Sequence, residues 1–160
     1  MKTVIALLMA LASASPAFAQ TNINLGGIST DPSAAVEISA DNLSVDQDTG
    51  TAVFSGNVVI GQGALRLSAG SVRVVYAEET GDIAQLMASG GVTFVTDTQA
   101  AEAASADYNL TTGQLILSGN VLLSQGASAL SADKMTVDLT SGTAQMSGRV
   151  RTVFQQDGGN

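Results

Sequence analysis

The tetrapeptide Ser-Gly-x-Val occurs four times in this chain at nearly regular intervals. The copies begin at Ser55, Ser89, Ser118 and Ser147, which lie 34, 29 and 29 residues apart. A turn sequence that ends in glycine precedes each copy, and a short segment of alternating apolar and polar residues precedes each turn. Self-similarity at a period of this length indicates one supersecondary unit that is stacked several times. The chain is therefore expected to fold as a stack of four related units.

Within each unit the apolar residues recur at every second position, as in Leu65-Arg66-Leu67-Ser68. That period is typical of half-buried β-strands, and the closely spaced glycine-containing turns favour antiparallel connections. In the first, second and fourth units the apolar parity shifts once, for example between Ala132 and Met135, which indicates a bulge or bend. In the third unit Ala106 and Tyr108 continue the parity of Ala104, so its bend is expected to be weaker or placed differently. We predict an all-β fold of eight bent strand passes at residues 36–46, 51–61, 64–76, 83–95, 100–110, 114–124, 128–139 and 143–153.

The composition excludes several kinds of chemistry. The 160 residues include no His and no Cys, so His-based triads, thiol nucleophiles and the usual zinc sites are not available. Six basic residues against 14 acidic ones give a net charge of −8, which opposes binding to nucleic acid. We therefore expect no catalytic residue, no metal, no cofactor and no nucleic-acid partner.

The first 19 residues have the pattern of a secretory signal peptide. Lys2 precedes an apolar run at residues 3–12, and Ala17-Phe18-Ala19 supplies small residues at the two positions that a signal peptidase reads. An apolar run of about ten residues spans only half of a ~30 Å hydrocarbon core, which argues against a membrane anchor. We expect export and cleavage after Ala19, followed by a flexible segment at 20–34, one domain at 35–153 and a polar tail at 154–160.

Three consecutive stretches carry a resemblance to a known family: Val36-Glu37-Ile38-Ser39-Ala40-Asp41, Val53-Phe54-Ser55-Gly56-Asn57-Val58-Val59-Ile60 and the turn Gly61-Gln62-Gly63. Together with the other repeats, they resemble the OstA-like domain of the LptA family of periplasmic lipopolysaccharide transport proteins. The resemblance covers residues 35–153. It implies an open, V-folded antiparallel β-jellyroll, open at both ends.

The resemblance also implies a function and partners. Protomers of this family join end to end and shield the acyl chains of lipid A between the inner and outer membranes. The expected location is the periplasm. The expected partners are lipopolysaccharide, further copies of the chain in a head-to-tail oligomer, and the inner-membrane-anchored and outer-membrane translocon components of the same transport system.

The inward positions of the predicted passes are mostly aliphatic and could line an apolar groove. The resemblance places Val36 and Ile38 of the first strand at lipid-contact positions, with Val45, Phe54 and Tyr108 at matching inward places. The full set of expected lipid-binding residues is Val36, Ile38, Val45, Phe54, Val58, Ile60, Leu67, Val74, Tyr76, Phe94, Tyr108, Leu117, Val137 and Met146.

Two strand edges are expected to pair with partners. An open sheet leaves unpaired N–H and C=O groups that can template another strand. The expected edges contain Val36, Glu37 and Ile38 at one end and Arg149, Val150 and Arg151 at the other. Glu37 of one protomer would face Arg149 or Arg151 of the next.

Two other interpretations remain open. An apolar inward face is ordinarily a dry core, so the chain could be an exported structural β-repeat scaffold without lipid cargo. An exported carbohydrate-active enzyme would need paired carboxylates inside a cleft. Asp41, Asp107 and Asp133 are assigned to one repeat position, but Ser71 replaces the acid in one unit, which favours a role at a bend.

Overall fold

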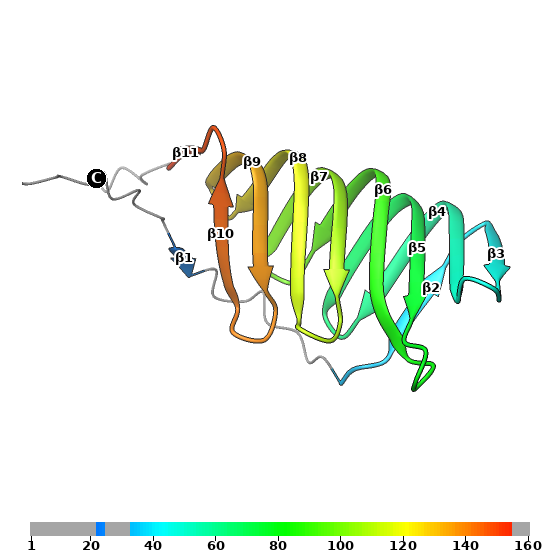
Figure 1. Ribbon diagram of the computed structural model, residues 1–160. Helices are drawn as coiled ribbons and strands as arrows, with labels where there is room; N and C mark the ends of the chain where they lie inside the picture. Colours follow the sequence, from blue (N-terminus) through cyan, green and yellow to red (C-terminus); the bar gives the residue numbers. More distant parts are fainter. Residues whose placement is uncertain (1–21, 25–32, 155–160) are drawn as a thin grey trace, which may run out of the picture.

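The computed structural model describes residues 22–24 and 33–154, and all of their helical or strand structure is β-strand (Figure 1). Short strands lie at both ends of the chain, and long strands lie between them. The signal peptide expected at 1–19 and residues 155–160 of the expected tail lie outside the described residues. The strands are β1 (Asn22–Asn24), β2 (Val36–Ser39), β3 (Asn42–Asp46), β4 (Thr51–Gln62), β5 (Leu65–Tyr76), β6 (Ile83–Val95), β7 (Gln99–Asn109), β8 (Gln114–Gln125), β9 (Ser128–Asp138), β10 (Thr143–Ser147) and β11 (Arg151–Val153).

The strands form one sheet in the order β1-β10-β9-β8-β7-β6-β5-β4-β2. β3 also pairs with β4, and β11 also pairs with β9, so the first and last passes are each split into two short strands. Neighbouring strands are antiparallel, and in Figure 1 they stand side by side, each long strand bent near its middle. The prediction of an open antiparallel β-jellyroll with eight bent passes is confirmed.

The bends divide the sheet into two halves. The register shifts between Ser55 and Val58 in β4, and again between Ser118 and Val121 in β8, with similar shifts in the strands between them. Half A contains β3, β10 and the parts of β4 to β9 next to the connections at 47–50, 77–82, 110–113 and 139–142. Half B contains β2, β11 and the parts of β4 to β9 next to the connections at 63–64, 96–98 and 126–127.

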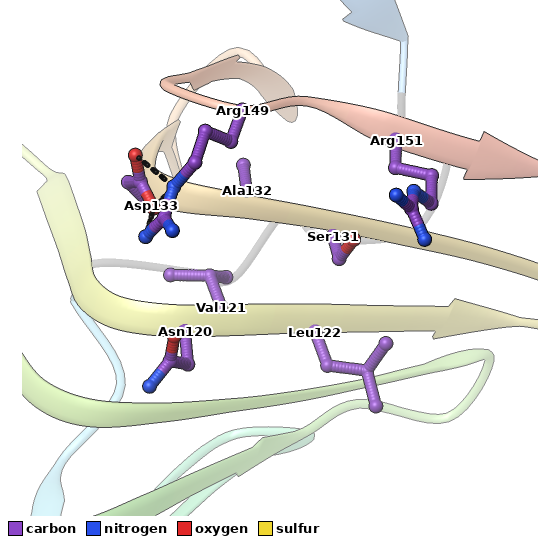
Figure 2. Close-up of a pocket in the computed structure, with 8 residues that line it drawn as sticks. All are labelled: Asn120, Val121, Leu122, Ser131, Ala132, Asp133, Arg149 and Arg151. Carbon is purple, nitrogen blue, oxygen red and sulfur yellow. Dashed lines mark hydrogen bonds and ion pairs between the residues drawn. The ribbon is translucent and has the colours of Figure 1, made fainter.

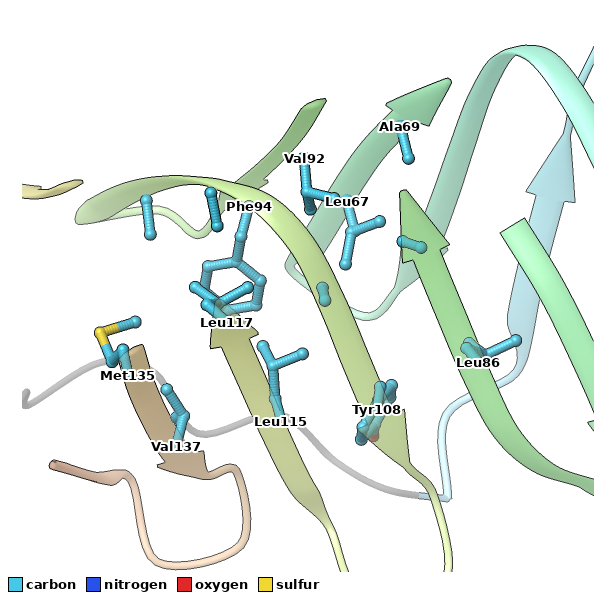
Figure 3. Close-up of a cluster of buried hydrophobic side chains, with 14 of the residues drawn as sticks. Leu67, Ala69, Leu86, Val92, Phe94, Tyr108, Leu115, Leu117, Met135 and Val137 are labelled. Atoms are coloured by element: carbon cyan, nitrogen blue, oxygen red, sulfur yellow. The ribbon is translucent and has the colours of Figure 1, made fainter. Parts of the chain in front are cut away.

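The core lies between the two halves. Buried and exposed residues alternate along the strands on either side of each bend, so the inner face is apolar. Figure 3 shows Phe94 from half B and Leu115, Leu117, Met135 and Val137 from half A within one cluster of buried side chains. Burying a side chain of this size completely contributes about 1.5–3 kcal/mol, so the contact between the halves stabilises the fold.

The glycine of each Ser-Gly-x-Val copy makes the bend possible. Gly56, Gly90, Gly119 and Gly148 have φ values of 79°, 82°, 85° and 77°, and the residue after each also has a positive φ. Glycine adopts this conformation without the steric cost that a Cβ brings. A Cβ at Gly119 would lie 2.7 Å from the Cβ of Ala104, so the close approach of the facing strand also requires glycine.

Aspartate side chains support the first and last bends. The backbone N–H of Asp41 donates to the carbonyl of Gly56 at 2.9 Å, and Asn57 Nδ2 donates to Asp41 Oδ2 at 2.9 Å. Arg149 and Asp133 form an ion pair of 2.6 Å at the last bend, and hydrogen bonds from Arg149 lower the pKa of the Asp133 carboxyl. The carboxylates of Asp41 and Asp133 therefore lie at bends, which is the role that the sequence pattern favours.

The third unit bends at the equivalent place, which corrects the sequence-based expectation. In β7 the buried residue before the bend is Ala103 and the buried residue after it is Ala106, so the parity does shift. Ala104 lies opposite Gly119, where the first and last units have aspartate. Asp107 lies three residues farther along and does not share the position of Asp41. Alanine is found on both faces of this strand, so the sequence around the bend shows no contrast in polarity that would reveal the shift.

The segment expected to be flexible contains a strand. β1 pairs antiparallel with β10, with Asn22 opposite Gln145 and Asn24 opposite Thr143. β1 covers Thr143 to Gln145 of β10, an outer strand of the sheet that would otherwise offer unpaired backbone groups on that side. Residues 20, 21 and 25–32 of the same segment lie outside the described residues.

The bend predicts unequal costs for two glycine substitutions. Gly119→Ala should lower the free energy of unfolding by about 3 kcal/mol or more, because a positive φ and a clash with Ala104 add together. Gly81→Ala is the matched control: Gly81 also has a positive φ, 74°, but a Cβ added there would have no other atom within 4 Å. It should cost about 1–2 kcal/mol. Urea unfolding measures both, and equal losses would show that the bend tolerates a side chain.

Candidate functional site

Rows of apolar side chains cross the inner face from one end of the sheet to the other. Residues directly opposite one another on antiparallel strands project from the same face, so the register identifies each row. In half A one row is Leu43, Phe54, Val72, Ala88, Ala106, Leu117, Met135 and Met146, and the next is Val45, Ala52, Val74, Leu86, Tyr108, Leu115, Val137 and Ala144. In half B an apolar row runs through Ile38, Ile60, Leu67, Phe94, Ala101, Leu123 and Leu130, and Thr152 of β11 is the polar residue at its end.

The structure places the residues expected to bind lipid on this inner face, with very different exposure. Nine are buried: Val58, Ile60, Leu67, Val74, Phe94, Tyr108, Leu117, Val137 and Met146. Val36, Ile38, Phe54 and Tyr76 are partly buried and pack against the core. Val45 is 60% exposed.

The inner face is uncovered at the end formed by β3. Leu43 and Val45 are 56% and 60% exposed, although each lies in a row whose middle members are fully buried. Phe54, the next member of the Leu43 row, is only partly buried. An apolar molecule can therefore contact the inner face at this end without any rearrangement of the core.

A second opening lies where the outer ends of the halves meet. Val36 of half B, with Ile83 and Leu110 of half A, lines a hollow of about 400 Å³. Near it, the Tyr108 hydroxyl donates to Gln62 Oε1 at 2.9 Å, which joins half A to half B. Burial raises the pKa of Tyr108, so its hydroxyl keeps its proton and remains a donor at neutral pH.

The sequence interpretation missed Gln62, Leu86 and Leu130 as inner-face residues. Glycine stands on both sides of Gln62, a pattern that favours a turn over a strand. Leu86 and Leu130 are buried, but each lies among alanines and serines, where the alternation is weak. Strict counting of every second residue back from Phe94 would have found Leu86, and counting back from Ala132 would have found Leu130.

One expected partner edge is free in the structure. Val36, Glu37 and Ile38 lie in β2, which pairs on one side with β4. Its other side meets no strand among the described residues, and the same holds for the outer side of β3.

The other expected edge differs from the prediction. Of its three residues only Arg151 lies in a strand, β11. Arg149 and Val150 lie in the connection from β10, because consecutive positive φ values at Gly148 and Arg149 end the strand. Figure 2 shows Arg149 turned toward Asp133 of its own chain, with Arg151 lying farther along the same surface. These side chains line a shallow hollow of about 300 Å³ on the outer side of the sheet.

The described residues contain no group of three or more Asp and Glu side chains placed to hold a metal ion. Nor do they contain a helix that is long and apolar enough to cross a membrane.

Comparison with known proteins agrees with this architecture. One similar solved structure is the crystal structure of LptH, described as the LptA homologous periplasmic component of the conserved lipopolysaccharide transport device from Pseudomonas aeruginosa. The present protein is 17% identical to LptH in sequence and superposes on it with a TM-score of 0.71. The match covers 79% of this chain and 99% of that one, and at this identity it shows a shared fold. The search of curated proteins gave no match. Residues 37–143 match the family model described as LptA/(LptD N-terminal domain) LPS transport protein. Since the match spans most of the chain, the protein belongs to this family of lipopolysaccharide transport proteins.

Proposed function

We propose that this protein holds the acyl chains of lipopolysaccharide between halves A and B in the periplasm, and so shields them from water between the inner and outer membranes. The observation that carries the proposal is the set of apolar rows that cross every pass and reach the uncovered end at β3. Each CH₂ group buried there gains about 0.8 kcal/mol, so the tails need no charged contact. The net charge of −8 opposes the phosphates of the head group and leaves them outside the halves.

Cargo must separate the halves to reach the middle of the rows. Leu117, Met135 and Val137 are 0% exposed, so the two halves are in contact there when no cargo is present. Leu43 and Val45 at the end are exposed, so an acyl chain can start there and advance one pass at a time. It replaces contacts between the halves with contacts to itself, and the apolar area hidden from water is largely conserved.

The uncovered end provides a direct test. Val45→Asp should weaken binding of lipopolysaccharide about tenfold or more, because a carboxylate then stands in an apolar path. Val45 is already 60% exposed, so the substitution should leave the fold intact. Fluorescence anisotropy of labelled lipopolysaccharide against the mature protein measures the affinity, and thermal unfolding checks the fold.

Ser44→Asp is the matched control for this variant. Ser44 is exposed on the same strand but projects from the opposite face of the sheet. The Ser44→Asp substitution therefore adds the same charge outside the apolar path. Equal losses in the two variants would mean that general charge repulsion, not the groove, controls binding. A wild-type protein that binds no lipopolysaccharide would favour the alternative, an exported structural scaffold with a dry core.

The strand edges supply a way to join protomers end to end. β3 and β10 each have five residues. Because directions alternate through the sheet, β4 and β10 run the same way and β3 runs opposite to both, so β3 of one protomer can pair antiparallel with β10 of the next. β2 can meet β11 in the same way. Components of the transport system that share this fold, at the inner or the outer membrane, can use the same edges.

Arg151 is the better junction partner for Glu37. Arg149 is already engaged by Asp133, whereas Arg151 lies in the edge strand β11 and has no ion pair within the described part of the chain. Glu37 is exposed on β2. The two charges would lie on the same side of a β2–β11 junction.

Charge reversal tests this junction. Glu37→Arg and Arg151→Glu should each weaken self-association about two- to fivefold, because like charges then meet, and the double variant should restore it. Arg149→Gln is the control and should leave association unchanged. Sedimentation velocity over a wide concentration range gives the association constants. Failure of the double variant to recover would place the junction elsewhere.

β1 competes with a partner for β10. It covers three of the five residues of β10, Thr143 to Gln145, and runs in the direction that a partner's β3 would take. Removal of residues 20–24 should therefore strengthen self-association, because the edge is then open before the partner arrives. A truncated protein that associates less than the full mature chain would show that β1 contributes to the junction instead.

A further inference from the structure

Polar side chains interrupt the apolar inner face at the outer end of half B. Gln62 ends β4, Thr96 follows β6, and Gln99 and Gln125 lie opposite each other where β7 begins and β8 ends. The backbone N–H of Thr96 donates to the carbonyl of Gln99 at 2.9 Å, so these positions lie at one level of neighbouring strands. We call these four residues the polar rim. None of them carries a charge.

Two of the four rim residues, Gln62 and Gln99, are buried, and Thr96 and Gln125 are partly buried. Gln62 is 2% exposed and Gln99 is 4% exposed. Within the described part of the chain, neither the amide nitrogen nor the amide oxygen of Gln99 has a hydrogen-bond partner, and neither has the hydroxyl of Thr96. Buried polar groups in proteins are nearly always paired, and leaving one unpaired costs free energy. The protein without cargo therefore carries unused hydrogen-bonding groups on its inner face.

Gln62 shows what a rim amide does when a partner is present. It accepts a hydrogen bond from the Tyr108 hydroxyl of the opposite half, at 2.9 Å, and its nitrogen donates to the carbonyl of Ala34 at 3.2 Å. Val36, the strand partner of Gln62, lines the hollow between the outer ends of the halves. When the halves separate, the bond between Tyr108 and Gln62 opens.

We infer that the polar rim is a subsite for the uncharged polar groups at the base of acyl chains, namely ester and amide linkages and neighbouring hydroxyls. This inference rests on the proposed function. The rim lies beside the half-B row, two residues farther out along the same strands, so an acyl chain lying against the inner face near that row can place its linkage at the level of Gln99. Amide and hydroxyl side chains match neutral carbonyls and hydroxyls in both donors and acceptors. A phosphate site would require cationic groups, which the rim lacks.

Gln99→Leu separates this role from a structural one. The variant should raise the Tm by about 2–5 °C, because it removes an unpaired buried amide. It should also weaken binding of lipopolysaccharide about five- to tenfold, the equivalent of one lost hydrogen bond. Binding of diphenylhexatriene, a hydrocarbon probe without hydrogen-bonding groups, should stay unchanged. Gln114→Leu makes the same substitution at an exposed position of β8 and should leave both affinities unaltered.

Thr96→Val is the second variant, since it removes an unpaired hydroxyl with little change in shape, and it should act in the same direction. A more stable Gln99→Leu protein with unchanged affinity for lipopolysaccharide would overturn the inference, and so would equal losses for lipopolysaccharide and diphenylhexatriene. A lower Tm would show that the amide is already satisfied and would overturn it as well. Wild-type protein that fails to bind lipopolysaccharide contradicts the proposed function first, so the two failures are told apart.

Discussion

The close approach of a glycine to the facing strand, repeated at each bend, is the contact on which the rest of the structure depends. At Gly119 the φ is 85°, and a Cβ there would lie 2.7 Å from the Cβ of Ala104. The bend shifts the parity of the strand, so residues buried before it and after it face one interior. A sheet without the bend would present its apolar rows to water, because the described part of the chain has no helix to cover them. The repeat in the sequence is thus a repeat of the bend.

Most of the fold could be predicted because polarity alternates with high contrast in most passes. The six long strands begin and end within one residue of the predicted passes. Prediction failed where the contrast disappears: Ala103 is buried and Ala104 is exposed, yet both are alanine. It also failed at β1, because Asn22, Ile23 and Asn24 are too few to establish a periodicity, and their pairing with β10 depends on an edge more than a hundred residues away.

The candidate site was predictable in its membership but not in its exposure. Parity along a strand fixes the face on which a residue lies, so Val45 and Val137 were both assigned inward, and they do share a row. Which of them is covered depends on how far the opposite half extends, and that information is not local. Arg149 illustrates the same limit. Its sequence position suggests an outward strand residue, but its positive φ turns the side chain to Asp133.

A protein that carries apolar cargo must be stable when empty and still admit the cargo. The facing surfaces here consist mainly of alanine and medium-sized aliphatic side chains, and aromatic residues make up only 4% of the chain. Aliphatic surfaces of this kind hold the halves together through contact area more than through directional bonds. Cargo that enters between them returns the same kind of contact, so the free energy that opposes opening is largely recovered as each pass fills. Directional bonds lie at the bends, with Asp41 and Asp133, where the halves need not part. Between the outer ends of the halves, the bond from Tyr108 to Gln62 is the directional contact that entering cargo has to open.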